Sequence, residues 1–362
     1  MLIDKAELSS LPARTKLMPC GYKAELSSLP ARTKLMPCGY KFLKPLSKGP
    51  DIMKQAYYLT FLITMAIGLG AGPVFAEDLP AETKKGEKSG TWTEPSTEMK
   101  FVRVEGGCFR MGQLPLETRL LKREVGDYEY KKYYADELPR HKVCLDGFWM
   151  GATEVTQKEW VKVMGFNPSH FNTDENFPVD SVSWQDANNF LEKLNKENKT
   201  DEFRLPTEAQ WEFAARGNSE DVMYHTGNSI TSKQANFNGS IAFGLNLRDE
   251  YRKSPVKTGS FPPNAYGLHD MHGNVWEWCQ DWYGEKYYEV SPLKNPPGPE
   301  EGDMRVLRGG SWFRYSGHIR SATRYKNKPT GQYADTGFRV VKSPQTAPEQ
   351  SLPDKFIFSP DF

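Results

Sequence analysis

The loop around Asp270 carries two carboxylates whose spacing suits a hard cation. Asp270 and Glu277 lie seven residues apart, on either side of Gly273, which permits a tight turn. Calcium takes about six to eight oxygen ligands, and the main-chain carbonyls of Gly273 and Val275 can add to the two carboxylates. The segment is therefore compatible with a structural calcium site. The alternative is that both acids only accept hydrogen bonds from loop amides.

A second stretch, 312–336, mixes rigid aromatic side chains with small polar ones. Such a composition is typical of binding surfaces, because aromatic rings supply contact area and small polar groups supply adaptable hydrogen bonds. We expect 313–319 and 325–333 to form one exposed binding surface, with an ordinary surface loop as the alternative. The candidate ligand-binding residues are Phe313, Arg314, Tyr315, Ser316, His318, Ile319, Tyr325, Asn327, Gln332 and Tyr333.

Apolar residues and arginines within and beside this stretch can fix its ends in place. Trp312, Ala322 and Phe338 are apolar and are expected to point inward. Four arginines can pair with carboxylates and so fix the loop ends. They are Arg308, Arg320, Arg324 and Arg339.

The cysteines and histidines do not form a metal-binding pattern. Cys108, Cys144 and Cys279 follow the N-terminal region and permit at most one disulfide, which leaves one thiol over. All three are interpreted as small buried apolar residues. No histidine pair has the spacing of a helical metal site, and only His272 and His318 are expected near the binding stretch.

The elements that position these residues read as an α+β fold with many loops. Strands are expected at 101–104 and 142–150, with shorter ones at 274–278, 305–312 and 337–342, and 113–140 is expected to be a surface loop. Three helices begin at capping residues, where a hydroxyl can accept a main-chain hydrogen bond. The caps are Thr156, Ser183 and Thr207.

The N-terminal region predicts export. An 18-residue segment is repeated without change within 1–52, and we interpret this part as unstructured or as preceding the true start. Residues 53–76 combine a lysine, an apolar run and a small-residue cleavage site, which is the pattern of a secretory signal peptide. The alternative is an uncleaved membrane anchor. Residues 77–99 read as a flexible linker, 100–342 as the folded domain and 343–362 as a disordered tail.

Charge argues against one class of partner. Residues 1–54 hold ten Lys/Arg and four Asp/Glu, and 55–76 hold neither, so the remainder is acidic in a chain of net charge +1. A nucleic-acid-binding protein would need a basic face. We therefore expect a protein or surface ligand, no nucleic acid, and no membrane association after signal cleavage.

Three motifs resemble the formylglycine-generating-enzyme (sulfatase-modifying factor) family. They are Arg204–Gly217 (RLPTEAQWEFAARG), Gly273–Trp278 (GNVWEW) and Arg308–Trp312 (RGGSW), followed by Gly337–Arg339 (GFR). The resemblance covers roughly Met99 to Lys342 and implies an irregular C-type-lectin-like fold. It also implies calcium binding by Asp270, Gly273, Val275 and Glu277, and a second site at Asn236, Phe237, Asp249 and Tyr251, with Glu250 as a competitor for Asp249.

The same resemblance places the family's two catalytic cysteines at Arg314 and Ile319. Neither residue can act as a soft ligand for copper(I), which argues against copper and against oxidation of a sulfatase cysteine to formylglycine. The arrangement of these motifs around the stretch 312–336 also resembles the variable proteins of diversity-generating retroelements. The sequence therefore favours a periplasmic or secreted, non-catalytic ligand-binding protein. The alternatives are a periplasmic metal-dependent oxidoreductase or maturation factor acting on a protein or small molecule, and an accessory chaperone.

Overall fold

The computed structural model describes residues 90–343. Within 90–343, no helix has both the length and the apolar character needed to cross a membrane. The predictions for 1–52, 53–76, 77–89 and 344–362 fall outside the described residues.

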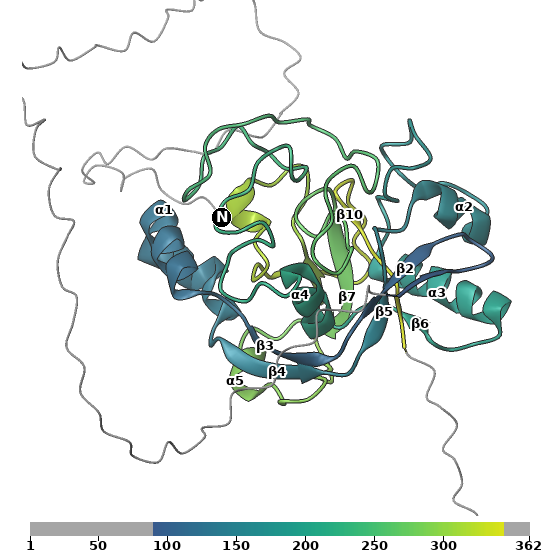
Figure 1. The fold of residues 1–362 in the computed structure, drawn as a ribbon, viewed down its shortest axis with the longest axis horizontal. Coiled ribbons are helices and arrows are strands. Elements are labelled where there is room, and N and C mark those ends of the chain that lie inside the picture. Colours follow the sequence, from purple (N-terminus) through teal and green to yellow (C-terminus); the bar gives the residue numbers. More distant parts are fainter. Residues whose placement is uncertain (1–89, 344–362) are drawn as a thin grey trace, which may run out of the picture. The chain divides into compact units, whose positions relative to one another are not determined.

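A five-stranded antiparallel sheet joins segments that are far apart in the sequence (Figure 1). The expected strand at 101–104 is confirmed as β2 (Lys100–Val104). The expected strand at 142–150 is interrupted at Asp146 and Gly147 and forms β4 (His141–Leu145) and β5 (Phe148–Gly151). The strand order is β1 (Thr91–Thr93), β2 (Lys100–Val104), β5 (Phe148–Gly151), β11 (Val341–Lys342) and β6 (Phe203–Arg204).

A second sheet brings two of the family-like motifs, Gly273–Trp278 and Arg308–Trp312, beside the segment that starts at Gly337. In it, Glu277 of β7 is paired with Arg308 of β8 on one side and with Gly337 of β10 on the other. The order is β10 (Thr336–Gly337), β7 (Trp276–Trp282), β8 (Arg305–Arg308) and β9 (Tyr325–Asn327). The stretch 312–336 therefore begins just after β8 and ends at β10.

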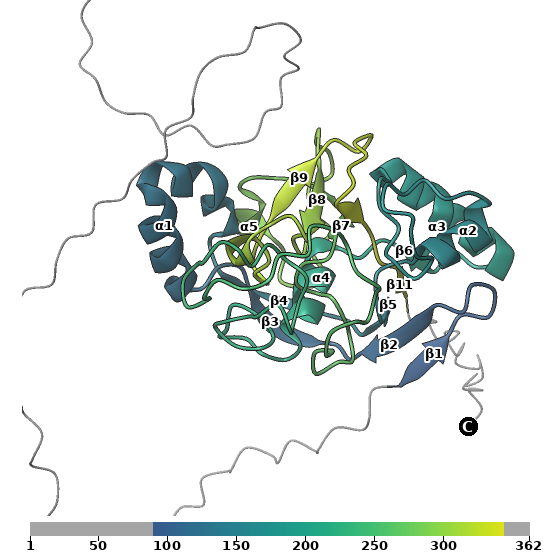
Figure 2. The ribbon, with the colours of Figure 1, turned by 90° about the horizontal axis from the view of Figure 1, so that it is seen from above.

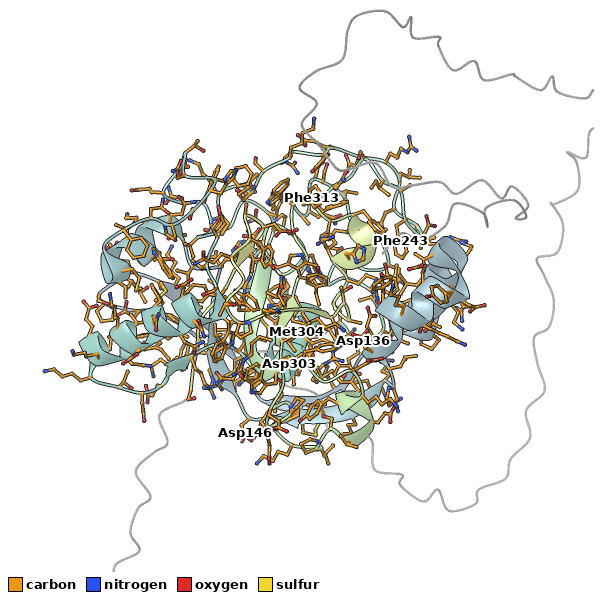
Figure 3. The ribbon with its side chains drawn as sticks, turned by 180° about the vertical axis from the view of Figure 1, so that it is seen from behind. Asp136, Asp146, Phe243, Asp303, Met304 and Phe313 are labelled. Atoms are coloured by element: carbon orange, nitrogen blue, oxygen red, sulfur yellow. A yellow bond between two sulfur atoms is a disulfide. The ribbon has the colours of Figure 1, made fainter. Side chains whose placement is uncertain are left out.

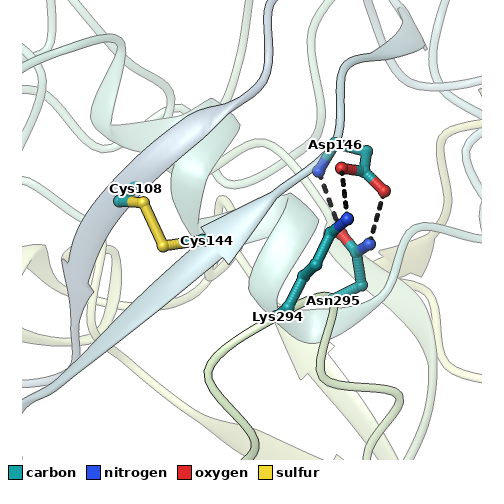
Figure 4. Close-up of a disulfide and its surroundings, with 5 residues drawn as sticks. All are labelled: Cys108, Cys144, Asp146, Lys294 and Asn295. Carbon is teal, nitrogen blue, oxygen red and sulfur yellow. Dashed lines mark hydrogen bonds and ion pairs between the residues drawn. A yellow bond between two sulfur atoms is a disulfide. The ribbon is translucent and has the colours of Figure 1, made fainter.

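Strands β3 (Gly107–Met111) and β4 (His141–Leu145) form a separate antiparallel ladder in which Cys108 lies opposite Cys144. The two sulfur atoms form a disulfide (Figure 4). The interpretation of these two cysteines as small buried apolar residues was wrong, because the strand register places their side chains together. Cys279 is buried and free, as expected.

The three predicted helices are confirmed with their caps. The hydroxyl oxygens of Thr156, Ser183 and Thr207 accept hydrogen bonds from the amides three residues further on. Helices α2 (Gln157–Met164) and α3 (Trp184–Asn198) lie at one end of the described domain (Figure 2), and α4 (Glu208–Arg216) is buried along its length.

Helix α1 (Pro115–Tyr133) occupies most of 113–140, where a surface loop was expected. The loop prediction was wrong because contacts with distant residues hold this largely charged helix. Glu117 lies 2.9 Å from Arg320, and Leu120 and Leu121 are buried in a cluster with Phe243 and Ile319. The short elements η1 (Ala135–Glu137), α5 (Tyr287–Val290) and η2 (Ser316–His318) complete the described fold.

The described domain begins earlier than predicted. Residues 90–99 were expected to belong to a flexible linker, but β1 pairs with β2, and Trp92 packs against Phe101 and Phe203. Glu94 is buried and accepts hydrogen bonds from Ser96 and Thr97, which close a turn between the two strands. This segment therefore belongs to the folded domain.

Candidate functional site

The loop from Asp270 to Val275 packs tightly against Asn236. Gly273 has φ 93° and forms a bridge with Asn236, and a Cβ at this glycine would overlap the carbonyl oxygen of Asn236. Asp270 and Asn274 also adopt positive φ angles. Two segments that were assigned to different calcium sites are therefore in direct contact.

The Glu277 carboxylate has strong protein partners on both oxygens. Arg339 donates hydrogen bonds to both oxygens at 2.6 Å, and the Trp211 indole donates one to Oε2 at 2.7 Å. All three side chains are fully buried. This ion pair provides the principal countercharge for Glu277, so it supports a structural role for this residue more directly than a metal-binding role.

Asp270 has a different carboxylate neighbour, Glu154, which sequence reasoning missed. Oδ2 of Asp270 accepts the Gly259 amide at 2.6 Å, while Oδ1 is buried without a hydrogen-bond partner. Glu154 Oε1 accepts from Asn274 at 3.0 Å, and its Oε2 is likewise buried without a partner. No local spacing in the sequence relates Glu154 to a residue so far along the chain.

Burial and proximity shift both acids toward their neutral forms. Burial raises the pKa of Glu154 well above its usual range, and the nearby Asp270 carboxylate raises it further. Burial also raises the pKa of Asp270, and the Gly259 amide and the Arg339 guanidinium offset only part of this rise. The pair therefore needs either a shared proton or a cation to be stable.

The residues of the second predicted calcium site have other partners in the structure. Asp249 is exposed, and its two oxygens accept hydrogen bonds from the amides of Ser232 and Glu250, which hold its pKa below the usual range. The Tyr251 ring stacks on Trp312, and the Phe237 carbonyl accepts from Gly239. Across 90–343, no group of three His, Cys, Asp or Glu side chains converges as a metal site.

The predicted binding surface is exposed in part. The exposed fractions are 53% for Phe313, 40% for Tyr325 and 43% for Tyr333. Gln332 is also exposed, while Arg314, Tyr315, His318 and Asn327 are half-buried. Figure 3 shows Phe313 at one edge of the molecule.

Two members of the predicted ligand set are not exposed, contrary to expectation. Ser316 and Ile319 are fully buried. The 3-10 turn η2 directs Ile319 into the cluster beneath α1, because its apolar side chain gains more there than in water. The surface is therefore made of two patches, one around Phe313 to Tyr315 and one from Tyr325 to Tyr333, with core residues between them.

The expected pairing of the four framing arginines is confirmed. All four guanidinium groups are buried. Arg320 contacts both Glu117 and Glu137, at 2.9 and 2.7 Å. The other ion pairs are Arg308 with Glu212, Arg324 with Glu208, and Arg339 with Glu277. Ala322 and Phe338 are buried as expected, whereas Trp312 is half-buried.

Aromatic rings connect the Phe313 patch to neighbouring loops. Trp312 packs against Phe313, against Phe171 and against Tyr251, with ring centroids 5.3 to 6.4 Å apart. On the other side, Tyr325 stacks on buried Trp276 at 5.0 Å. The exposed rings therefore rest on rings that are more deeply buried, which limits their freedom to collapse.

Two histidine environments lie behind this surface. His318 stacks on Tyr134, and burial lowers its pKa to about 3, with Arg314 and Arg320 adding to the effect. His272 stacks on His225, and its Nε2 accepts the His225 amide at 3.1 Å. Burial lowers the pKa of both rings in this pair, that of His225 to about 4. These rings are neutral and part of the packing.

The fold and these motifs define an irregular α+β domain with a surface framed by arginines. Residues 88–344 match the model of the sulfatase-modifying factor enzyme 1-like domain, so the chain belongs to that family. The family and the fold predicted from the sequence are thereby confirmed.

Several curated relatives illustrate the range of the family. The chain is 33% identical over 298 residues to the serine/threonine-protein kinase pkn1 of Chlamydia pneumoniae, covering 75% of this chain and 41% of the relative. It thus spans less than half the length of that relative. It is also 33% identical over 305 residues to the formylglycine-generating enzyme of Mus musculus, covering 68% of this chain and 76% of the enzyme.

Solved structures share the same fold. Treponema denticola variable protein 1 matches with a TM-score of 0.59 and 27% identity, covering 72% of this chain and all of that one. PvdO from Pseudomonas aeruginosa matches with a TM-score of 0.56 and 26% identity, again covering 72% of this chain and all of the other.

Proposed function

We propose that this chain is an exported, non-catalytic ligand-binding protein with a calcium-stabilised domain. The observation that carries the proposal is the surface around Phe313, Tyr325 and Tyr333, where exposed aromatic rings rest on a rigid frame. Exposed aromatics gathered on a preorganised surface usually mark an interaction site, because they bind without first paying the entropy of ordering. The likeness to Treponema denticola variable protein 1 supports a binding role. The proposal includes a surface that is diversified by a retroelement.

The residues at the family's thiol positions support a non-catalytic role. Arg314 provides no thiolate, and Ile319 is buried among apolar residues. Within 90–343 the free thiol is that of Cys279, which is fully buried, and burial raises its pKa well above the usual range. A thiol that is neutral and enclosed is a poor nucleophile and a poor copper ligand.

The Glu154–Asp270 pair supports the calcium part of the proposal. Each acid has one buried oxygen without a hydrogen-bond partner, and Asn236 Oδ1 is a third such atom nearby in the fold. A divalent cation would neutralise the two carboxylates and satisfy these oxygens. We propose that Asp270 and Glu154 hold calcium, with the carbonyls of Gly273 and Val275 as further candidates and Glu277 kept for Arg339.

Export is supported by the Cys108–Cys144 disulfide. Disulfides persist in oxidising compartments such as the periplasm and the extracellular space. The signal-peptide pattern at 53–76 predicts the same destination. We propose a periplasmic or secreted location.

The binding role can be tested by capture with the purified protein immobilised. Replacing Phe313 and Tyr333 together by Ala should abolish retention of partners from a cell-surface and periplasmic fraction. Phe166 has a matching exposure, 56% against 53% for Phe313, and belongs to the segment after α2, so Phe166→Ala is the control. Equal retention by both variants and the wild type would remove the proposal.

A further inference from the structure

Arg314 differs from the four arginines that frame the binding surface. Arg308, Arg320, Arg324 and Arg339 each meet a buried carboxylate at 2.9 Å or less. Arg314 has no ion pair and no side-chain hydrogen bond within 90–343. Its main chain is nevertheless fixed, since its carbonyl accepts the Asn238 amide at 2.8 Å.

Two exposed rings flank the Arg314 guanidinium. Its central carbon lies 5.8 Å from the centre of the Phe313 ring and 5.4 Å from that of Tyr325. Cation–π contacts of this kind attract a guanidinium but leave its hydrogen-bond donors unused. The guanidinium therefore bridges the two exposed patches and keeps its donors available.

The surroundings of Arg314 favour hydrogen bonding of these donors to an anion. Its Nε is buried without a partner, while the terminal nitrogens are not enclosed. His318 interacts electrostatically with Arg314 and is neutral, because burial and then the positive charge of Arg314 lower its pKa. A partly desolvated cation with unused donors binds a carboxylate more strongly than a fully hydrated one.

From this arrangement we infer that the surface binds a protein partner by an acidic side chain set beside an aromatic or apolar residue. The carboxylate meets the Arg314 fork, and the adjoining residue rests on Phe313 and Tyr325. Charge complementarity supports this occupant, and so does the exposure of the rings, which suits a partner's surface. The inference rests on the proposed binding function and assigns the chemistry of its ligand.

The test uses the full-length protein and defined polymers as probes. Biolayer interferometry would compare a glutamate–tyrosine copolymer with polyglutamate and with a lysine–tyrosine copolymer. The wild type should bind the glutamate–tyrosine copolymer at least about tenfold more tightly than either other polymer. Arg314→Gln should lose about tenfold in affinity, and Arg314→Lys should lose less, because it keeps the charge but not the fork.

Arg110→Gln is the matched control for net charge. Arg110 is exposed on β3 and lies opposite Lys142 in the separate two-stranded ladder. This variant should change the affinity less than twofold. Equal losses of copolymer affinity in Arg110→Gln and Arg314→Gln would show that binding depends only on net charge. That result would overturn the inference.

Two further outcomes would also overturn it. The first is equal affinity of the wild type for all three polymers. The second is binding to anionic phosphatidylglycerol vesicles without binding to the glutamate–tyrosine copolymer. If Arg314→Gln keeps full copolymer affinity while the Phe313 and Tyr333 substitutions abolish partner capture, the ligand chemistry is wrong and the binding function stands.

Discussion

Arg339 holds both carboxylate oxygens of Glu277, at 2.6 Å each, in the fully buried centre of the domain. The pair links the Gly-Phe-Arg motif, which begins in β10, to the Trp-Glu-Trp motif on β7. The ends of the binding stretch are thereby tied to the sheet that carries them. The same pair leaves Asp270 to share its site with Glu154 rather than with Glu277.

Breaking this ion pair should strongly destabilise the domain. Arg339→Gln leaves the Glu277 carboxylate buried without its countercharge, which costs about 3–5 kcal/mol in comparable cases. Urea unfolding followed by tryptophan fluorescence measures the change. Arg103→Gln removes a partly exposed arginine paired with exposed Glu105 and should cost less than about 1 kcal/mol. Similar costs for the two variants would show that Arg339 has no special role.

Calcium should stabilise the protein through Asp270 and Glu154. A ligand that binds only the folded state adds about 2.7 kcal/mol at a hundredfold excess over its Kd. Chelation should lower the melting temperature of the wild type, and Glu154→Gln and Asp270→Asn should each shrink that shift. Glu105→Gln is the control at an exposed carboxylate. An unchanged chelator effect in both variants would exclude this site.

Acid should destabilise the domain in part through His318. Burial lowers its pKa to about 3 in the folded protein, and an unfolded histidine titrates near about 6.5. The contribution of neutral His318 to the stability of the folded state is therefore fully present above pH 6.5. It is lost as the pH falls toward 3, because the unfolded chain binds the proton more tightly.

The size of this effect can be measured by comparing stability at two pH values. Between pH 7 and pH 4.5 the free energy of unfolding should fall by about 2 kcal/mol more in the wild type than in His318→Gln. Exposed His170 is the matched position, and His170→Gln should leave the loss unchanged. Identical pH dependence in the wild type and His318→Gln would contradict the assignment.

The exposed rings should matter little for folding. Phe313→Ala should change the free energy of unfolding by less than about 0.5 kcal/mol, because the ring is 53% exposed. Phe338→Ala removes a fully buried ring and should cost about 3–5 kcal/mol. Equal costs, measured by urea unfolding, would place Phe313 in the core.

Features set by neighbouring residues could be predicted from the sequence. The caps at Thr156, Ser183 and Thr207 depend on residues only three positions apart, and all three are present. The motifs around Arg308 and Arg339 also identified the frame of the surface, since buried arginines require carboxylate partners.

Features set by distant contacts could not be predicted in this way. Helix α1 has few apolar residues, and Glu117 finds Arg320 from 203 positions away. The Cys108–Cys144 disulfide depends on the register of β3 against β4. Glu154 carries no local sign of its role beside Asp270, and Ile319 lies inside a segment of otherwise polar character that η2 turns toward the core.

The chain keeps the family scaffold, and we propose that it lacks the family's thiol chemistry. Mass spectrometry of a Cys-x-Pro-x-Arg peptide incubated with the purified protein, copper and oxygen tests this most directly. With Arg314 and Ile319 at the thiol positions and Cys279 enclosed, the peptide mass should stay unchanged. A loss of mass corresponding to conversion of the cysteine to the formylglycine aldehyde would contradict the account.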